Sequence, residues 1–315
     1  MSRVAIDELQ QALAARALEL GFDNARAGRL AEHYVDAELR GARGHGAERM
    51  RWLHGFDDIR PVASPRLVER REGLARYDSD GLLGYLALAE ALDAELAEPP
   101  DGARLVVVGD CFPTGRLGWF AEMGAAEGLV TLVTATSTAR ISHPDGSRPL
   151  LGTNPLCLAL PGNPPTVVDV SMGRTTYGSV LAAAAAGRRL PQSLAVTPEG
   201  AAETDPQEVI SDRSGIAPFG GDQAHKGFAL ALLVELLCTA LAGTPGHAAV
   251  VLLAQPQAAP AEELRAALAD RRFPGDGSRE RRAQSVARGF VELPDDLWRW
   301  LQEGSAASSA GSPSR

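Results

Sequence analysis

The order of the predicted elements constrains the fold most, because helices and strands alternate irregularly and no Gly-x-Gly-x-x-Gly sequence follows a predicted strand. Regular alternation would predict a doubly wound parallel sheet, and the glycine motif is the usual fingerprint of dinucleotide binding in such a sheet. A chain of 315 residues is long enough for one large domain or two closely packed domains. The pattern therefore indicates an α+β fold without the classical dinucleotide-binding arrangement.

Apolar residues at helical spacing in the first forty positions predict a helical hairpin that ends at Gly41. Further helices are expected at 81–98, 117–127, 180–186, 228–241, 261–270 and 295–301. Strands are expected at 105–108, 129–136, 155–160, 166–170 and 248–253. The segment 273–282 is expected to be an Arg-rich loop.

The run 228–241 is apolar nearly all round a helix, so we expect a buried central helix in which Glu235 needs a polar partner. The apolar stretch 228–243 is too short to span a bilayer. The N-terminus also lacks a basic region followed by an apolar core. We therefore expect a cytoplasmic protein that makes no membrane contact.

Charge and cysteine content exclude other classes of function. The net charge is −9, from 31 basic and 40 acidic residues, and it disfavours nucleic-acid binding. The three cysteines, Cys111, Cys157 and Cys238, are odd in number and widely spaced. Neither a disulfide framework nor a metal site is expected from them.

Lys226 is the only lysine among the 31 basic residues. Because every other positive charge is Arg, this position is predicted to need a compact ammonium that a planar guanidinium cannot replace. Its place at the start of an apolar helix would add its charge to the positive helix end and attract a phosphate or carboxylate. Chance use of lysine is the alternative.

His45 and Arg49 lie four residues apart behind a Gly-rich segment, so on one helical turn they would face the same way. An imidazole can transfer a proton near neutral pH, and a guanidinium can bind a carboxylate with two parallel hydrogen bonds. Together they could bind an anionic substrate. An ordinary surface loop is the alternative.

Two turns could provide polar groups for a ligand. Gly152, Thr153 and Asn154 precede a proline, and the second turn, at 220–227, carries His225. A β-turn and a helix N-cap are the alternatives for these two segments.

Asp169 ends a predicted strand, where it could accept hydrogen bonds from ribose hydroxyls or simply cap the next turn. The Arg-rich segment that contains Arg279 could bind cofactor phosphates or could be a solvated surface.

These segments, in this order, resemble the malate/L-lactate dehydrogenase family, which lacks a classical Rossmann fold. The resemblance runs from about residue 5 to 301, and its most specific pieces are 116–119, 152–156, 168–171, 218–221 and 225–228. The family includes ureidoglycolate and sulfolactate dehydrogenases and piperideine-2-carboxylate ketimine reductases. It implies an NAD(P)-dependent homodimer with a mostly antiparallel central sheet surrounded by helices.

The resemblance also implies a division of the chain and a set of cofactor contacts. Residues 1–75, completed by 285–303, would form an N-terminal helical region that carries His45 and Arg49. Residues 76–284 would form the cofactor-binding α/β region, and 304–315 a flexible tail. NAD(P)H would be bound near Gly152, Asp169, Val170, Ser171, His225, Lys226 and Arg279.

Three positions depart from the family pattern. Gly44 stands where the family usually has Ser, Pro113 where it has a His that acts on the substrate oxygen, and Ser179 where it has Lys or Asp. Hydride addition to a ketone creates an alkoxide that needs an acid or an oxyanion site, whereas an imine can be protonated before hydride arrives. The departures therefore favour ketimine reduction over carbonyl reduction.

We accordingly expect hydride transfer to or from a small 2-oxo/2-hydroxy or 2-imino/2-amino acid. Arg49 would bind the substrate carboxylate and His45 would donate or accept the proton. Thr153, Asn154 and Ser179 would contact the substrate. The alternative is a ligand-binding homologue that keeps the pocket but has lost turnover.

Overall fold

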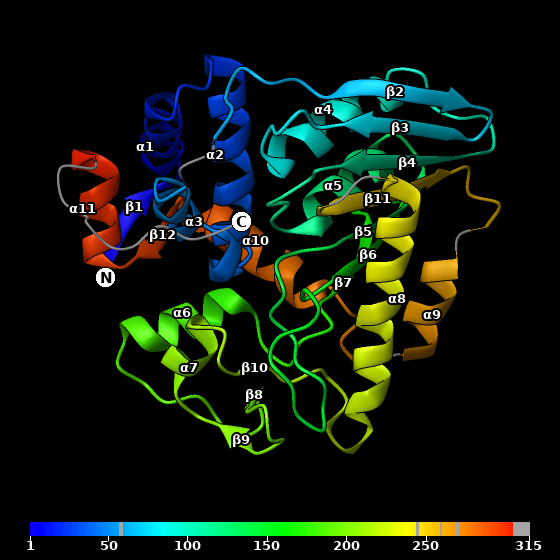
Figure 1. Ribbon diagram of the computed structural model, residues 1–315. Helices are drawn as coiled ribbons and strands as arrows, with labels where there is room; N and C mark the ends of the chain where they lie inside the picture. The colour runs from blue at the N-terminus through cyan, green and yellow to red at the C-terminus, as the bar shows by residue number, and fades with distance from the viewer. Residues whose placement is uncertain (57–58, 244–245, 259, 269–270, 305–315) are drawn as a thin grey trace.

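The computed structural model describes residues 1–56, 59–243, 246–258, 260–268 and 271–304. A seven-stranded sheet lies at its centre, and only its β3–β4 pair is parallel. The strand order is β2 (Arg66–Arg71), β3 (Leu74–Asp78), β4 (Ala103–Gly109), β11 (Ala248–Ala254), β5 (Val130–Ala135), β6 (Leu156–Leu160), β7 (Thr166–Val170). This mostly antiparallel sheet among helices confirms the expected α+β class (Figure 1).

Both faces of the sheet are covered, because successive side chains of a strand point to opposite faces. On β4, Val106 and Val108 are buried in the core cluster that includes residues of helices α4 (Gly84–Leu96) and α5 (Leu117–Ala126). Val107, between them, is buried in a second cluster with residues of α8 (Ala224–Ala242). The predicted buried strand and the helices that follow it are confirmed.

The N-terminal helical hairpin is confirmed as α1 (Ile6–Glu19) and α2 (Asn24–Leu39), and the Asp23 carboxylate caps α2 by accepting the Arg26 N–H at 2.9 Å. Leu9, Leu13 and Leu30 are fully buried where these helices pack. The ends of the chain join this unit, because β1 (Ser2–Ala5) pairs with β12 (Phe290–Leu293). Helices α3 (Glu48–Leu53), α10 (Asp276–Arg288) and α11 (Asp295–Glu303) complete it (Figure 1).

A smaller lobe contains the predicted Ala-rich helix, observed as α6 (Tyr177–Ala185), and a short helix α7 (Pro206–Ile210). Its three short strands are β8 (Ala195–Val196), β9 (Ala202–Glu203) and β10 (Gly215–Ile216). Val180, Val209 and Ile216 form its separate small core. The lobe lies below the N-terminal helices in Figure 1 and faces them.

Helix α8 contradicts the expectation of a helix buried all round. Only one side packs on the sheet, and leucines on the other side, Leu233 and Leu236 among them, are 56% and 61% exposed. The helical stretch Gly221–Ala242 is also long and apolar enough to cross a bilayer by length and composition alone, so the expected shortness of the run was wrong. The apolar composition of α8 predicted that the helix would be buried. It did not predict which surface would cover the side that carries the exposed leucines.

Other differences concern polar segments. The expected Arg-rich loop is helical from Asp276, where α10 begins after Gly275 in the left-handed region at φ 88°. Strands β2 and β3 were not predicted, and they place residues 66–71 and 74–78 in the sheet. The helix expected at 261–270 is observed as α9 (Pro260–Leu268). The tail expected from 304 lies, beyond its first residue, outside the described residues.

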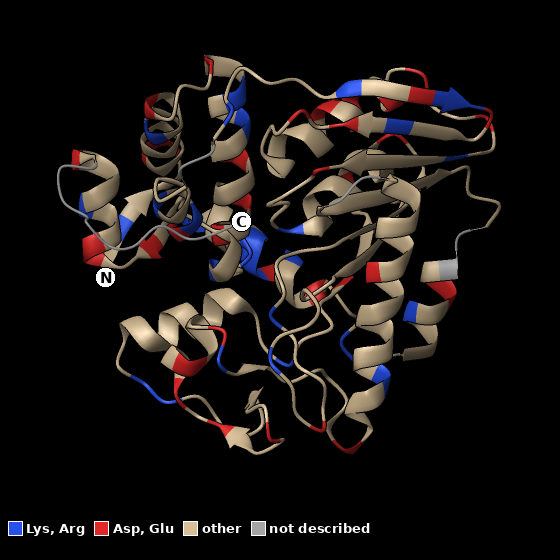
Figure 2. Ribbon diagram, viewed as in Figure 1, with Lys and Arg blue, Asp and Glu red and all other residues tan. Residues whose placement is uncertain are grey.

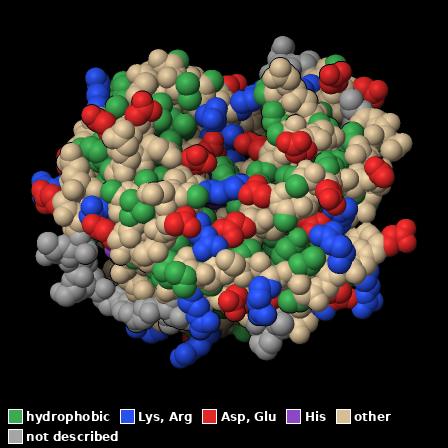
Figure 3. Space-filling model, turned by 90° about the horizontal axis from the view of Figure 1, so that it is seen from above, with side chains coloured by type: hydrophobic (Ala, Val, Ile, Leu, Met, Phe, Trp, Pro, Cys, Tyr) green, Lys and Arg blue, Asp and Glu red, His purple; other side chains and the backbone are tan. Residues whose placement is uncertain are grey.

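Acidic and basic side chains are interspersed on the face that contains the upper ends of α1 and α2 and strand β2 (Figure 3). Two ion pairs there, Arg26–Glu90 and Arg29–Asp93, connect α2 to α4. This face therefore presents no extended surface of one charge.

Candidate active site

A cavity of about 720 Å³ lies where the N-terminal helices, one end of the central sheet and the small lobe meet. The segments that line it are far apart in the sequence and come together only in the fold. They include His45 and Arg49, Tyr85, residues 112–117 and 136–140, Thr153, Asp169 and Ser171, Tyr177 and the start of α10. Among the described residues, no group of three or more His, Cys, Asp or Glu side chains is arranged to hold a metal ion.

The loop between α2 and α3 brings His45 and Arg49 into this cavity, as the spacing predicted. Glu38 fixes the loop, because its Oε1 accepts the Ala47 N–H at 2.8 Å. Gly46 permits this approach, since a Cβ there would lie 2.0 Å from the same oxygen. Burial raises the pKa of the Glu38 carboxyl to about 7.

The His45 side chain makes no hydrogen bond with the described residues, so both ring nitrogens are available to a ligand. Burial, and then the charges of Arg49 and Arg116, lower the pKa of His45 to about 3. The imidazole is therefore neutral at physiological pH.

Arg49 is held from two sides and keeps its terminal nitrogens free for a ligand. Its Nε donates to the Gly44 carbonyl oxygen at 2.8 Å, and its guanidinium carbon lies 4.8 Å from the Trp52 ring centroid. The Arg49 guanidinium makes no other hydrogen bond with the described residues. The arrangement suits a bidentate hydrogen bond with a carboxylate.

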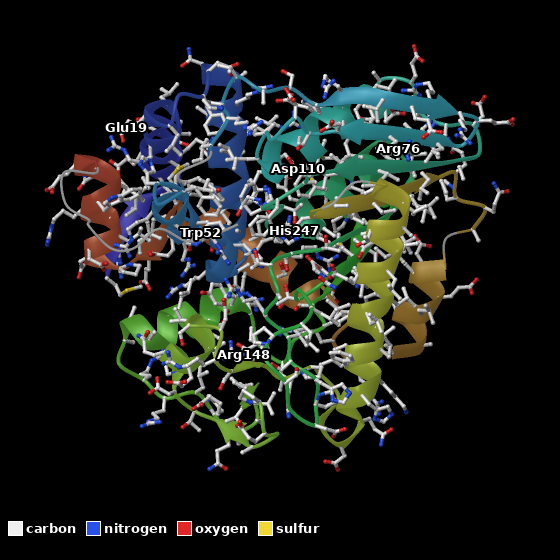
Figure 4. All side chains as sticks on the ribbon, viewed as in Figure 1. Glu19, Trp52, Arg76, Asp110, Arg148 and His247 are labelled. Carbon is white, nitrogen blue, oxygen red and sulfur yellow. The ribbon has the colours of Figure 1, made fainter. Side chains whose placement is uncertain are left out.

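Aromatic rings form part of the wall near Arg49, and sequence reasoning missed them. Trp52 lies edge-on to Phe112 at 6.3 Å between centroids, and Phe112 lies 4.7 Å from His247 (Figure 4). Tyr85 and Tyr177 also line the cavity. Helical periodicity marks such residues as core, so no sequence signal assigned them to a site.

The predicted substrate residues separate into different surroundings. Thr153 lines the cavity, but Asn154 is fully buried and points to α8, where its Nδ2 donates to Glu235 Oε2 at 2.8 Å. This bond supplies the partner that Glu235 was expected to need. Gly152 supports the turn, since a Cβ there would lie 2.4 Å from Asn154 Oδ1. Ser179 does not line the cavity, and its Oγ lies 2.9 Å from that of Thr176.

Two predicted cofactor residues face the cavity and a third does not. Asp169 accepts the Gly118 N–H at 3.1 Å, and burial raises the pKa of its carboxyl while Arg116 opposes this. Ser171 lines the cavity near Thr153, whereas Val170 is 43% exposed and lines none of its wall.

The remaining predicted cofactor residues lie outside the cavity of a single chain. His225 and Lys226 are exposed at the start of α8, and His225 lines a separate hollow of about 350 Å³. Arg279 pairs with Asp276 and lines an adjoining hollow of about 740 Å³.

The same Arg-rich segment brings a different arginine, Arg281, to the main cavity, where its Nε donates to the Arg40 carbonyl oxygen at 2.8 Å. On the ribbon of Figure 2, Lys and Arg positions are marked in this central region around α10. A basic group at a helix N-terminus is a favourable place for a phosphate.

Comparison with known proteins identifies the family to which the chain belongs. The family model for malate/L-lactate dehydrogenase matches residues 4–269. Over 257 residues, the chain is 33% identical to the Delta(1)-pyrroline-2-carboxylate/Delta(1)-piperideine-2-carboxylate reductase of Pseudomonas putida, covering 78% of this chain and 72% of that relative. It is 29% identical over 233 residues to the L-sulfolactate dehydrogenase of Methanothermobacter thermautotrophicus, covering 72% and 67%.

Solved structures agree over almost the whole length. A dehydrogenase from Sinorhizobium meliloti superposes with a TM-score of 0.86 at 27% identity, covering 96% of this chain and 97% of that one. The delta1-piperideine-2-carboxylate reductase from Pseudomonas syringae gives 0.81 at 26% identity, covering 96% and 99%. The expected resemblance is confirmed in sequence and in fold.

Proposed function

The chain belongs to the malate/L-lactate dehydrogenase family, and from that premise we propose that it reduces the C=N bond of a small 2-imino carboxylic acid with NAD(P)H. Its family places it among soluble NAD(P)-dependent oxidoreductases that act on 2-hydroxy acids or ketimines. The preference for an imine rests on one observation. The only histidine that lines the described cavity, His45, is held neutral, so this cavity holds no imidazolium to stabilise an alkoxide, and the resemblance places Gly44, Pro113 and Ser179 where relatives carry three further proton-handling groups.

The residues that face the cavity support this role. Arg49 presents free guanidinium nitrogens that would bind the substrate carboxylate through two parallel hydrogen bonds. His45 offers a neutral ring nitrogen that accepts a hydrogen bond from a protonated imine. Thr153 lines the same wall.

The cavity also fits a nicotinamide cofactor. Asp169 and Ser171 provide oxygen acceptors for ribose hydroxyls, and Arg281 beside the start of α10 provides positive charge for a phosphate. When bound, the cofactor supplies the hydride. Arg279 lines the adjoining hollow, which shares Arg40 with the main cavity and could hold the adenosine end.

We further propose that the protein is a homodimer. The apolar stripe of the N-terminal hairpin is buried within the chain. The exposed side of α8 is the better candidate, because it is almost free of charge (Figure 2) and carries Leu230, Leu232, Leu233, Leu236 and Leu237, each 39–61% exposed. A continuous apolar surface of this kind marks an interface, and an identical helix is the occupant that matches its length and lack of charge.

Lys226 begins the same stripe, since positions 226, 230, 233 and 237 lie on one side of a helix. Within one chain it lies outside the cavity. Its proposed cofactor contact, and that of His225, would therefore be made across the dimer. A cytoplasmic location accords with three free, buried cysteines.

Turnover of a substrate panel tests the proposed function. Purified protein is mixed with NADH or NADPH and with cyclic ketimine carboxylates, 2-oxo acids or sulfonated 2-oxo acids, and the absorbance of the reduced nicotinamide is followed. We expect oxidation fastest with a ketimine. Faster turnover of a 2-oxo acid would refute the imine preference, and no oxidation with any compound would favour a binding protein that has lost turnover.

A further inference from the structure

Tyr85 occupies the part of the cavity wall beside Pro113, where the resemblance places an imidazole in relatives. Helix α4 starts against this segment, since a Cβ on Gly84 would lie 2.8 Å from Phe112 N and 2.9 Å from Pro113 O. A Cβ on Gly115 would lie 2.2 Å from Tyr85 Cε1. The Tyr85 ring therefore packs against Gly115, two residues after Pro113.

The Tyr85 ring is fixed in place and lines the cavity. It is only 3% exposed, and it meets the rings of His33 and Tyr34 edge to face, with centroids 5.0 and 5.2 Å away. A side chain packed in this way loses little freedom when it acts on a substrate, so its hydroxyl is preorganised.

Two other polar groups of the cavity are less able to donate a proton. His45 is neutral, so its imidazolium is scarce at physiological pH. Ser171 Oγ donates to the Thr153 carbonyl oxygen at 3.4 Å.

The surroundings of Tyr85 keep its phenol protonated in the resting state, so that it holds a proton to donate. Burial raises the pKa of Tyr85, while the Arg49 guanidinium and then the Tyr34 hydroxyl act in the opposite direction. Both neighbours stabilise the phenolate that remains after the proton has left. A tyrosine beside a cation can thus donate a proton and still hold one in the resting state.

We propose that Tyr85 is the general acid of the reaction and replaces the imidazole that Pro113 excludes. This inference rests on the proposed function. The Tyr85 O–H bond breaks and its proton forms an N–H bond with the neutral imine, while C2 accepts the hydride and its two electrons. The product is the 2-amino acid, the nicotinamide is oxidised, and the phenolate takes a proton from water when the product leaves the open cavity.

The test compares two substrates in the wild type and in Tyr85→Phe. When the pH is above the pKa of its protonated imine, a cyclic ketimine carboxylate must receive a proton during reduction. The N-methylated iminium carries a permanent positive charge and needs hydride alone. For Tyr85→Phe we expect kcat on the ketimine to fall by about 10²- to 10⁴-fold, the usual contribution of a general acid. We expect reduction of the N-methyl iminium to stay within about threefold of wild type, since no proton is transferred.

The pH profile provides a second readout. In Tyr85→Phe only the ketimine that is already protonated in water can react. Its kcat/KM should therefore fall tenfold for each pH unit above the ketimine's pKa, while the wild type stays level. A level profile in the variant would overturn the role of Tyr85, whether or not the N-methyl compound is accepted.

Tyr77→Phe is the matched control, because Tyr77 lies on β3 outside the cavity and its hydroxyl donates to Glu95 on α4. This change should lower the melting temperature but leave turnover unchanged. Equal losses on both substrates in Tyr85→Phe would indicate a structural role and overturn the proposal, as would no loss on either. Absence of wild-type turnover with both substrates would overturn the proposed function itself, and with it the role of Tyr85.

Discussion

Glu38→Gln tests the physical account of the loop that carries His45. The Glu38 carboxyl is 8% exposed, and its pKa is raised from 4.5 to about 7, chiefly by burial. Above pH 7 the Glu38 carboxyl is charged in both states, so folding must bury a negative charge. Below pH 4.5 the carboxyl is protonated in both the folded and the unfolded chain, so no charge is buried. A group with a raised pKa in the folded state contributes stability that is fully present below pH 4.5 and is lost as the pH rises through 7.

The magnitude follows from the shift. At about 1.4 kcal/mol per pH unit, a displacement from 4.5 to about 7 amounts to roughly 3 kcal/mol, as an upper estimate. Gln keeps an oxygen that accepts the Ala47 N–H, so the loop contact is retained without the charge. We therefore expect the free energy of unfolding of Glu38→Gln, relative to wild type, to rise by up to about 3 kcal/mol between pH 4.5 and pH 8.5.

Urea unfolding at pH 4.5, 6, 7 and 8.5 measures this difference. Glu208→Gln is the control, because Arg213 lowers the pKa of the Glu208 carboxyl. Its substitution should therefore remove stability that is present above pH 4.5 and is lost at lower pH, which is the opposite sign. A pH-independent difference for Glu38→Gln would show that the folded chain does not bury this charge, and it would refute the reasoning.

Three further substitutions test the proposed site and interface. Arg49→Lys loses the planar fork, so KM for the substrate should rise about ten- to a hundredfold while KM for its methyl ester stays nearly constant. Equal effects on acid and ester would exclude a carboxylate contact. Leu233→Glu places a charge on the exposed side of α8 and should convert a dimer into monomers in sedimentation velocity; an unchanged sedimentation coefficient would move the interface elsewhere. Lys226→Met should weaken NAD(P)H binding about tenfold in calorimetric titration, and an unchanged Kd would remove Lys226 from the site.

Local sequence signals predicted the elements and residues that depend on near neighbours. The strand at 166–170 was predicted with its observed bounds, because its β-branched run is bounded by prolines on one side and a turn on the other. His45 and Arg49 line one cavity as near neighbours in the sequence, although His45 ends a short 3-10 helix, Arg43–His45, and Arg49 lies in α3, so they do not share one helical turn. Neither result required knowledge of distant contacts.

Features that depend on distant parts of the chain were not predictable in the same way. Asn154 was expected to face a ligand because it is a short polar residue in a turn, yet it bonds Glu235, 81 positions away. Whether an Asn in a turn faces solvent, a ligand or a neighbouring helix is decided by that helix, not by the turn. The exposed side of α8 is a related case, because apolar composition predicts burial without identifying the covering surface.

The proposed replacement of an imidazole by Tyr85 is the clearest example of a feature that local sequence signals do not predict. The sequence indicates that Pro113 has no group to donate a proton, but it gives no reason to connect that position with Tyr85, which lies in an apolar helix typical of a core. The connection arises because α4 begins at Gly84, where a Cβ would lie only 2.8 Å from Phe112 N and 2.9 Å from Pro113 O. A backbone approach of this kind allows a side chain from one element to occupy the space of a lost catalytic group on another. A family member that lacks a catalytic residue therefore loses the reaction step of that residue only under one condition. No residue that packs against the same position can then carry out the step instead.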